Sequence, residues 1–342
     1  MKCYKKISPF LLAVLLCGLL QPPTTAKTIH LASVYEAHIF QNSERFPNEE
    51  LPYRLYCPED YKEKPYPLVL QLNGAAQNGN DNVKHITPPN LFTEVLLREE
   101  NSTEYPCIIL APQCPYNDRW VKNFYGDISQ VMEMTLELLE EICNEYNVDR
   151  SRIYLVGFSS GASGVWDALF RCPKLFAAAI AMEGYTIPAF AKYIKNVPVW
   201  FFHCDEDHLI PVSVARDMAD ALQNAGSTVY QYTEYNYKEF LAANSEYGDN
   251  AHGVAWAQGS NYEPELLPWL FSWQNKHFVS PGDYLKNGFF DRKVSDEIEN
   301  AKSQLLIISV SLTSALILIS AISLFIYRQR FSKYIGRQKT HE

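Results

Sequence analysis

The sequence predicts an α/β fold built on a doubly wound, mostly parallel sheet. Short apolar segments alternate with segments of helical periodicity along most of the chain. Strands that alternate with helices favour a parallel sheet, because each helix provides the crossover to the next strand. Polar residues follow several of the apolar segments, and ligands of such sheets bind at the carboxyl ends of the strands. Those polar residues are therefore the candidates for chemistry.

The expected elements follow from the apolar residues, taken in order. Six segments rich in apolar residues are expected to be strands: residues 67–72, 107–111, 153–156, 176–181, 197–202 and 229–234. Apolar residues spaced three and four apart predict a helix from Ile128 to Cys143, which stops near Tyr146. Further helices are expected at residues 161–170, 212–225 and 265–273.

The two ends of the chain predict an association with a membrane. Residues 1–26 combine a basic start with a short apolar stretch, which predicts a cleavable secretory signal peptide, with an uncleaved anchor helix as the alternative. Residues 304–327 are rich in apolar residues and contain no charge over the length that spans a hydrocarbon core of about 30 Å, so a transmembrane helix is expected. A buried core helix is the alternative there. The basic residues of 328–342 predict a cytoplasmic tail.

The part between these ends is expected to be one domain outside the cytoplasm. Residues 27–278 have the length of one large α/β domain, and residues 279–303 are polar and acidic, as a stalk would be. The net charge of −9 argues against a nucleic acid as partner. Six of the 8 cysteines follow residue 26, but their spacing indicates no metal site and predicts no particular disulfide.

A Gly-x-Ser-x-Gly motif at residues 157–161 contains the candidate nucleophile. An apolar strand precedes it and a helical pattern follows, which is the setting of a nucleophile elbow. The serine of such an elbow lies in a strained turn, and small residues two positions away on each side let strand and helix pack closely. Ser159 has glycine at both positions. Ser160 would need glycine at 158 and 162, where Phe158 and Ala162 stand.

The partners of this serine are expected further along the chain. A serine hydroxyl needs a histidine base, and the histidine needs a carboxylate to hold its tautomer. In this class of fold the acid follows the serine and the histidine follows the acid. Asp207, in an acidic loop after a predicted strand, is the expected acid, and Asp205 is the alternative. His252 is the expected base, because it combines this order with a position before the final helix.

The acidic loop could instead hold a metal ion. It contains two histidines and three acids between residues 203 and 208. Zinc or calcium would require further ligands at defined spacing, and the sequence does not supply them. Neither a metal nor any other cofactor is therefore expected.

Two backbone N–H groups are expected to stabilise an oxyanion. One belongs to Ser160, the residue after the nucleophile, and the other to Ala75, in the loop of residues 73–79 after the first predicted strand. A simple glycine and asparagine turn is the alternative interpretation of that loop.

Several segments resemble one group of secreted α/β-hydrolases. The group comprises prolyl-oligopeptidase-like predicted peptidases and is close to feruloyl and acetyl-xylan esterases and polyhydroxybutyrate depolymerases; the similar segments are residues 51–56, 66–70, 111–115, 147–154 and 166–167. The resemblance extends from about residue 50 to about residue 275. It implies the α/β-hydrolase fold, with Ser159, Asp207 and His252 as the catalytic triad.

The sequence departs from this group in three places. The group's His-Gly in the oxyanion loop is Asn73-Gly74 here, and the glycine expected after His203 is Cys204. The elbow continues as Ser-Gly-Ala rather than the common Met-Gly-Gly. No member of the expected triad is lost, but the change at Asn73 bears on the geometry of the oxyanion loop.

These observations together predict a membrane-anchored, extracytoplasmic serine hydrolase that cleaves esters through an acyl-enzyme. The expected partners are a small-molecule, carbohydrate or peptide ester and, through the C-terminal helix, the membrane. Ester is favoured over peptide because the sequence shows no propeller or other gating domain. A serine peptidase of the prolyl-oligopeptidase type is one alternative. A non-catalytic binding module with the same fold is another.

Overall fold

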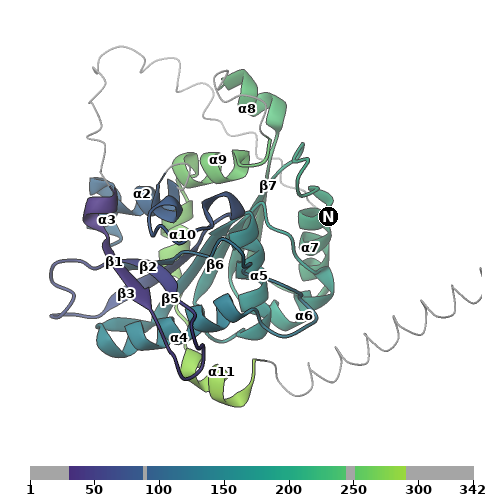
Figure 1. Ribbon diagram of the computed structural model, residues 1–342. Helices are drawn as coiled ribbons and strands as arrows, with labels where there is room; N and C mark the ends of the chain where they lie inside the picture. Colours follow the sequence, from purple (N-terminus) through teal and green to yellow (C-terminus); the bar gives the residue numbers. More distant parts are fainter. Residues whose placement is uncertain (1–30, 88–90, 244–250, 290–342) are drawn as a thin grey trace, which may run out of the picture.

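An eight-stranded sheet runs through the centre of the computed structural model, which describes residues 31–87, 91–243 and 251–289 (Figure 1). The strand order is β1-β2-β4-β3-β5-β6-β7-β8. The pairs β1–β2 and β2–β4 are antiparallel, and all other pairs are parallel. The bounds are β1 Glu36–Phe40, β2 Leu51–Tyr56, β3 Tyr66–Leu72, β4 Ile108–Pro112, β5 Val148–Phe158, β6 Ala178–Met182, β7 Val199–Cys204 and β8 Tyr230–Tyr235.

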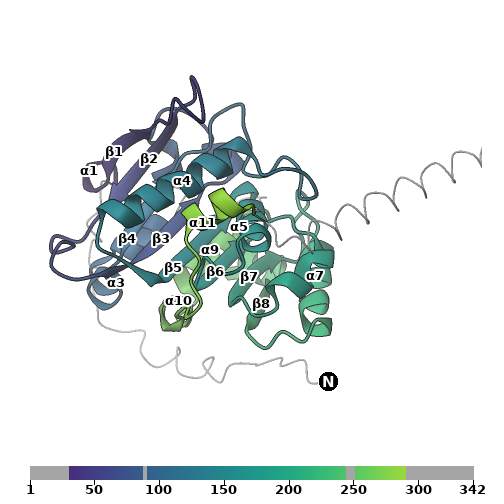
Figure 2. The same cartoon turned by 90° about the horizontal axis from the view of Figure 1, so that it is seen from below.

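Helices cover both faces of this sheet (Figure 2). The α-helices are α1 Leu31–Val34, α2 Leu91–Leu97, α3 Glu99–Glu104, α4 Gln130–Glu145, α5 Ser160–Arg171, α6 Ala191–Ile194, α7 Ser213–Asn224, α8 Tyr237–Ala243, α9 Val254–Tyr262, α10 Leu266–Ser272 and α11 Pro281–Asn287. Short 3₁₀ turns are η2 Ala75–Gln77, η3 Lys84–Ile86 and η4 Pro188–Phe190.

The core consists of two apolar layers, one on each face of the sheet. Successive strand residues point to opposite faces, so Leu68 and Leu70 of β3 pack in the layer with α4 and α5, whereas Val69 packs in the layer with α2 and α10. Every residue of β3 is buried. This burial on both faces explains why the central strands have continuous apolar sequences, as is typical of parallel sheets.

The structure confirms the α/β class and the mostly parallel sheet. The six predicted strands correspond to β3 through β8, and all bounds agree within two residues except the start of β5, which lies five residues before the predicted one. The two antiparallel strands at one edge were not predicted. Four of the five residues of β1 are exposed or half-buried, so that strand has no apolar run to reveal it.

Helix α11 lies in the part of the chain whose composition suggests a stalk. Helix α11 packs on the domain, where the backbone N–H of Gly282 donates to Glu140 of α4 at 3.0 Å. The Tyr284 hydroxyl accepts the backbone N–H of Lys174 at 3.0 Å. These contacts place residues 281–287 with the domain, whereas the composition alone suggested a polar linker.

The predictions for the chain ends concern other residues. The signal peptide, the transmembrane helix, the cytoplasmic tail and most of the stalk fall on residues 1–30 and 290–342, outside the described residues. Within residues 31–87, 91–243 and 251–289, no helix is both long and apolar enough to cross a bilayer.

Candidate active site

The turn between β5 and α5 has the geometry of a nucleophile elbow. Ser159 lies in this turn at φ 54° and ψ −119°, a conformation that a non-glycine residue rarely adopts. A Cβ on Gly161 would lie 2.1 Å from the carbonyl oxygen of Leu72, and one on Gly157 would lie 2.5 Å from the backbone of Gly161. Both glycines are therefore required by the close approach of strand and helix, as the motif predicts.

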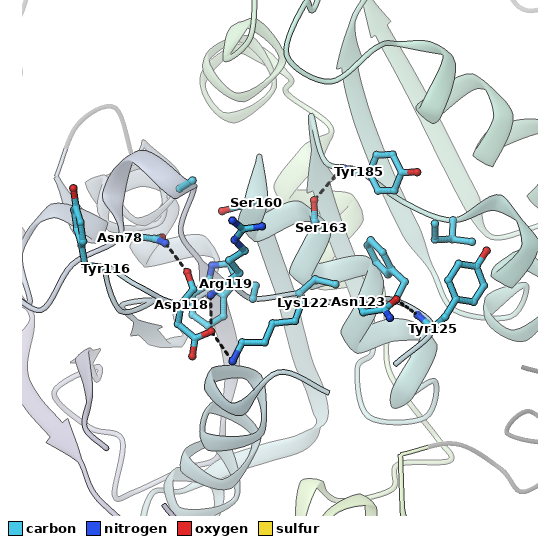
Figure 3. A pocket seen from close by; sticks show the side chains of 15 residues that line it. Asn78, Tyr116, Asp118, Arg119, Lys122, Asn123, Tyr125, Ser160, Ser163 and Tyr185 are labelled. Atoms are coloured by element: carbon cyan, nitrogen blue, oxygen red, sulfur yellow. Dashed lines mark hydrogen bonds and ion pairs between the residues drawn. The ribbon is translucent and has the colours of Figure 1, made fainter. Parts of the chain in front are cut away.

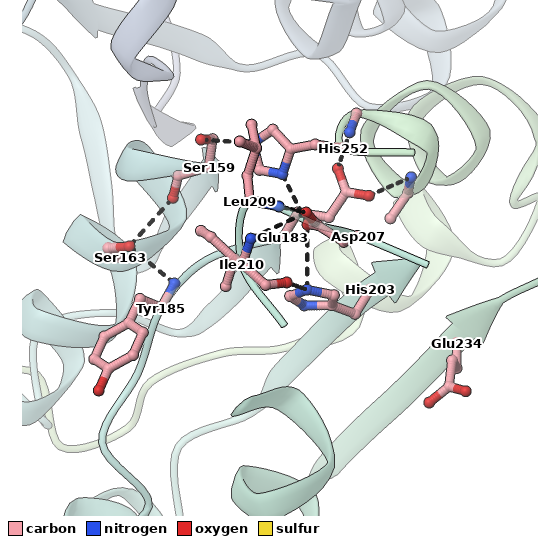
Figure 4. A network of polar contacts seen from close by, with 12 residues as sticks. Ser159, Ser163, Glu183, Tyr185, His203, Asp207, Leu209, Ile210, Glu234 and His252 are labelled. Atoms are coloured by element: carbon pink, nitrogen blue, oxygen red, sulfur yellow. Dashed lines mark hydrogen bonds and ion pairs between the residues drawn. The ribbon is translucent and has the colours of Figure 1, made fainter. Parts of the chain in front are cut away.

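The structure brings His252 and Asp207 to this serine (Figure 4). The His252 Nε2 atom lies 2.9 Å from Ser159 Oγ, and Nδ1 lies 2.8 Å from Asp207 Oδ2. Asp207 follows β7, and His252 precedes α9, so both approach from the carboxyl edge of the sheet. This is the arrangement in which an imidazole can accept the serine proton while a carboxylate holds its other nitrogen.

Asp207 is surrounded by hydrogen-bond donors. Its Oδ1 accepts the backbone N–H groups of Leu209 at 2.9 Å and Ile210 at 3.0 Å. Its Oδ2 lies 3.3 Å from Nε2 of buried His203, in addition to the bond with His252. Burial raises the pKa of this carboxyl, but the hydrogen bonds from the two histidines and the backbone outweigh it and hold the pKa well below its usual value. Asp207 is therefore ionised and favours the tautomer with the proton on His252 Nδ1.

The alternative acid, Asp205, has different partners. Its carboxylate accepts the backbone N–H of Tyr237 at 2.9 Å and the side-chain amide of Asn236 at 2.8 Å, so it supports the start of α8. Glu206 pairs with Lys238 at 3.1 Å. The acids of the loop thus contact different elements, and the described residues contain no group of His, Cys, Asp and Glu that could hold a metal ion.

Ser160 and Ala75, the expected oxyanion donors, both line a cavity of about 910 Å³ beside the elbow (Figure 3). Each is the first residue of its helical turn, Ser160 in α5 and Ala75 in η2. The backbone N–H groups at the start of a helix have no intrahelical acceptor. They are therefore suited to an anionic oxygen.

Asn73 holds the loop that carries Ala75. Its side-chain amide donates to Gly74 O at 2.8 Å and to Asn78 Oδ1 at 2.9 Å, and its Oδ1 accepts the backbone N–H of Cys114 at 3.0 Å. Asn73 is buried, so these bonds replace those it would make with water. At the position of the group's histidine, Asn73 thus makes three side-chain hydrogen bonds that hold the loop.

Replacing Asn73 by alanine should impair turnover more than substrate binding. The change removes three hydrogen bonds that hold the Ala75 loop, and a displaced oxyanion donor costs roughly tenfold to a hundredfold in kcat. Steady-state kinetics on a short ester would measure this. A variant with unchanged kcat would show that the loop holds its position without Asn73.

Glu183 belongs to this site but was not predicted. It follows β6, has φ 55° and is completely buried. Its carboxyl accepts the backbone N–H of Gly253 at 2.6 Å and that of Ala255 at 3.0 Å, and thereby fixes the turn that follows His252. Burial raises the pKa of Glu183 to about 8, helped by the nearby charge of Asp207 and opposed by the backbone N–H groups. Glu183 lies two residues after the predicted strand of residues 176–181 and between the nucleophile and the base in sequence, and this position was the available signal.

The raised pKa of Glu183 should make the protein less stable as the pH rises. Between about pH 4.5 and 8 the folded chain keeps a proton on Glu183 that the unfolded chain releases, so the unfolding free energy falls by up to about 1.4 kcal/mol per pH unit. Chemical denaturation of the wild type and Glu183→Gln from pH 5 to 8 measures this slope. The wild type should show the steeper decline, since the amide does not titrate. Parallel slopes would contradict the assignment.

Comparisons with known proteins find similarity to esterases. Residues 118–241 match the model of the phospholipase/carboxylesterase family. "Probable acetylxylan esterase A" of Neosartorya fischeri is 29% identical over 116 residues, which cover 31% of this chain and 30% of that protein. Its counterpart of Aspergillus fumigatus is 28% identical over the same length. The chain therefore matches less than a third of the length of these curated relatives.

Two solved structures share the fold. A thermostable esterase superposes with a TM-score of 0.65 at 32% identity, covering 71% of this chain and 64% of that one. A ferulic acid esterase superposes with a TM-score of 0.53 at 20% identity, covering 70% and 98%. With the sheet order and the elbow, these matches show the α/β-hydrolase fold, and the solved structures and curated proteins to which the chain is similar are named as esterases.

Proposed function

We propose that the protein is a serine carboxylesterase. The observation that carries the proposal is the continuous contact from Ser159 Oγ through His252 to buried Asp207, with distances of 2.9 and 2.8 Å. The relatives named as esterases support the same reaction class. A non-catalytic module would have no need to keep a serine in strained backbone beside an oriented imidazole.

The proposed reaction proceeds in two steps. Ser159 Oγ attacks the ester carbonyl while His252 Nε2 takes its proton, and the backbone N–H groups of Ser160 and Ala75 stabilise the oxyanion. His252 then gives the proton to the leaving alcohol, and an acyl-enzyme results. Water, deprotonated by His252, then attacks the acyl-enzyme; the bond to Ser159 Oγ breaks, His252 returns the proton to Ser159, and the carboxylic acid leaves. Asp207 stabilises the imidazolium in both steps.

A panel of small esters tests the proposal. Purified protein should hydrolyse p-nitrophenyl acetate and butyrate with saturation kinetics, and the corresponding anilides much more slowly. Acetylated xylan and methyl ferulate belong in the panel, because relatives are named for acetylxylan and ferulic acid esters. Anilide turnover that equals ester turnover would favour the peptidase alternative. A folded protein without activity on any of them would favour the binding module.

We also propose that the enzyme is anchored in a membrane, with its domain outside the cytoplasm. The support is the sequence alone: the apolar residues 304–327, the basic residues 328–342 and the signal-like residues 1–26. Ester hydrolysis should therefore sediment with membranes and be released by detergent but not by alkaline carbonate. Truncation after residue 303 should release it to the soluble fraction, and activity that is soluble without truncation would contradict the anchor.

A further inference from the structure

Several aromatic residues line the cavity beside the elbow. Five of its residues are aromatic: Tyr116, Trp120, Phe124, Tyr125 and Tyr185. Tyr116 and Tyr185 are 74% and 47% exposed, so two large rings border the entrance. At about 910 Å³ the cavity can hold a group considerably larger than acetyl. One part of an ester substrate would thus lie here while its carbonyl meets Ser160 and Ala75.

The charges of the same lining do not cancel. Its charged residues are Asp118, Arg119 and Lys122. Lys122 Nζ lies 3.2 Å from Asp118 Oδ1, and this oxygen also accepts the backbone N–H of Arg119 at 2.8 Å. Within the described part of the chain, no carboxylate is paired with the Arg119 guanidinium. The lining therefore carries one uncompensated positive charge, in a protein of net charge −9.

Arg119, which carries this charge, lies close to the expected oxyanion donors. Arg119 directly precedes Trp120, and the indole N–H of Trp120 donates to Asn73 O in the oxyanion loop at 2.8 Å. In Figure 3 the Arg119 side chain extends from the Asp118 side of the cavity towards Ser160. A guanidinium presents parallel donors that match a carboxylate, and such bidentate pairs are stronger than ordinary surface ion pairs.

We propose that Arg119 forms an anion subsite, and that the preferred substrates are esters that carry a carboxylate on the group entering this cavity. The inference rests on the proposed esterase function and adds the substrate class. The aromatic walls bind the body of the group, and Arg119 pairs with its carboxylate. An ester with a neutral group of equal size fills the same space but leaves the guanidinium without a partner.

Matched ester pairs test the subsite from both sides of the scissile bond. On the acyl side, p-nitrophenyl hydrogen succinate is compared with p-nitrophenyl butyrate. On the alcohol side, the butyryl ester of 4-hydroxybenzoate is compared with that of 4-hydroxybenzamide. The readout is the ratio of kcat/KM for the anionic and the neutral ester. In the pair whose carboxylate lies on the side of the ester that enters the cavity, this ratio should be roughly fivefold to tenfold lower in Arg119→Gln than in the wild type.

Two control variants separate local from general charge effects. Arg119→Lys keeps the charge and should retain part of the preference. Lys62→Gln removes one charge from a side chain that does not line the cavity and should leave both ratios unchanged. Salt should reduce the wild-type preference, because the Arg119 side chain is exposed. If the ratio of kcat/KM for the anionic and the neutral ester is the same in Arg119→Gln as in the wild type for both pairs, the subsite is overturned, even if neutral esters are hydrolysed well.

Failure of the esterase proposal is recognised separately. If no ester in either pair is hydrolysed, the esterase proposal fails, and binding decides the subsite. Saturation-transfer NMR on Ser159→Ala would compare monomethyl succinate with methyl butyrate. The subsite is supported if monomethyl succinate binds more strongly than methyl butyrate to Ser159→Ala and if this difference disappears when Arg119→Gln is added to the same variant. Equal binding of the two overturns it.

Discussion

Ser159→Ala should lower kcat/KM for p-nitrophenyl butyrate by roughly 10⁴-fold or more, with the fold intact. The hydroxyl makes its hydrogen bond with Nε2 of His252, so the change removes the nucleophile and leaves this one ring nitrogen without its protein partner. Activity that remains would come from the oxyanion N–H groups and from binding alone. Ester kinetics and a thermal unfolding curve of the same preparation measure both quantities.

Ser102→Ala is a matched control for this change. Ser102 lies on α3, where its hydroxyl donates to Glu99 O on the protein surface at 3.3 Å. The control should retain full activity and nearly unchanged stability. If Ser159→Ala retained ester hydrolysis comparable with this control, Ser159 would not be the nucleophile.

Asp207→Asn should have the second largest effect, a loss of roughly 10³- to 10⁴-fold in kcat. The amide that replaces the carboxylate can donate to His252 Nδ1, which favours the tautomer with the proton on Nε2. That tautomer cannot accept the proton of Ser159. The loss should therefore appear in kcat rather than in KM, and it should diminish at high pH if hydroxide can substitute for the base.

Asp205→Asn is the control for this second prediction, because it changes the neighbouring acid of the same loop. It weakens the contacts with Asn236 and Tyr237 and should cost about 1 kcal/mol in stability, with kcat reduced less than threefold. If the two variants lost activity equally, Asp207 would have no special role, and the alternative acid would have to be reconsidered.

The elbow was predictable from sequence because its constraint is local. Gly157 and Gly161 are needed for close backbone approach within five consecutive residues, and the flanking strand and helix have clear apolar patterns. The central strands were predictable for a similar reason, since burial on both faces gives them continuous apolar sequences.

Other parts of the site depend on contacts between distant residues. Sequence alone left Asp205 as an alternative to Asp207, because two acids two positions apart differ only in how the loop folds. Glu183 is separated by 70 positions from Gly253, the donor it bonds, so no local pattern reveals its role. The strand β1 was missed because its residues are largely exposed, and α9 because no strong periodicity marks it.

The most direct test of the account is covalent labelling with a fluorophosphonate probe. Such probes react with a serine whose proton is taken by an adjacent base, so they report the assembled contact between Ser159 and His252 without knowledge of the natural substrate. We expect rapid labelling of the wild type, very slow labelling of Asp207→Asn and none of Ser159→Ala. Labelling that persists in Ser159→Ala, or a folded wild type that does not react, would contradict a catalytic triad at Ser159, His252 and Asp207.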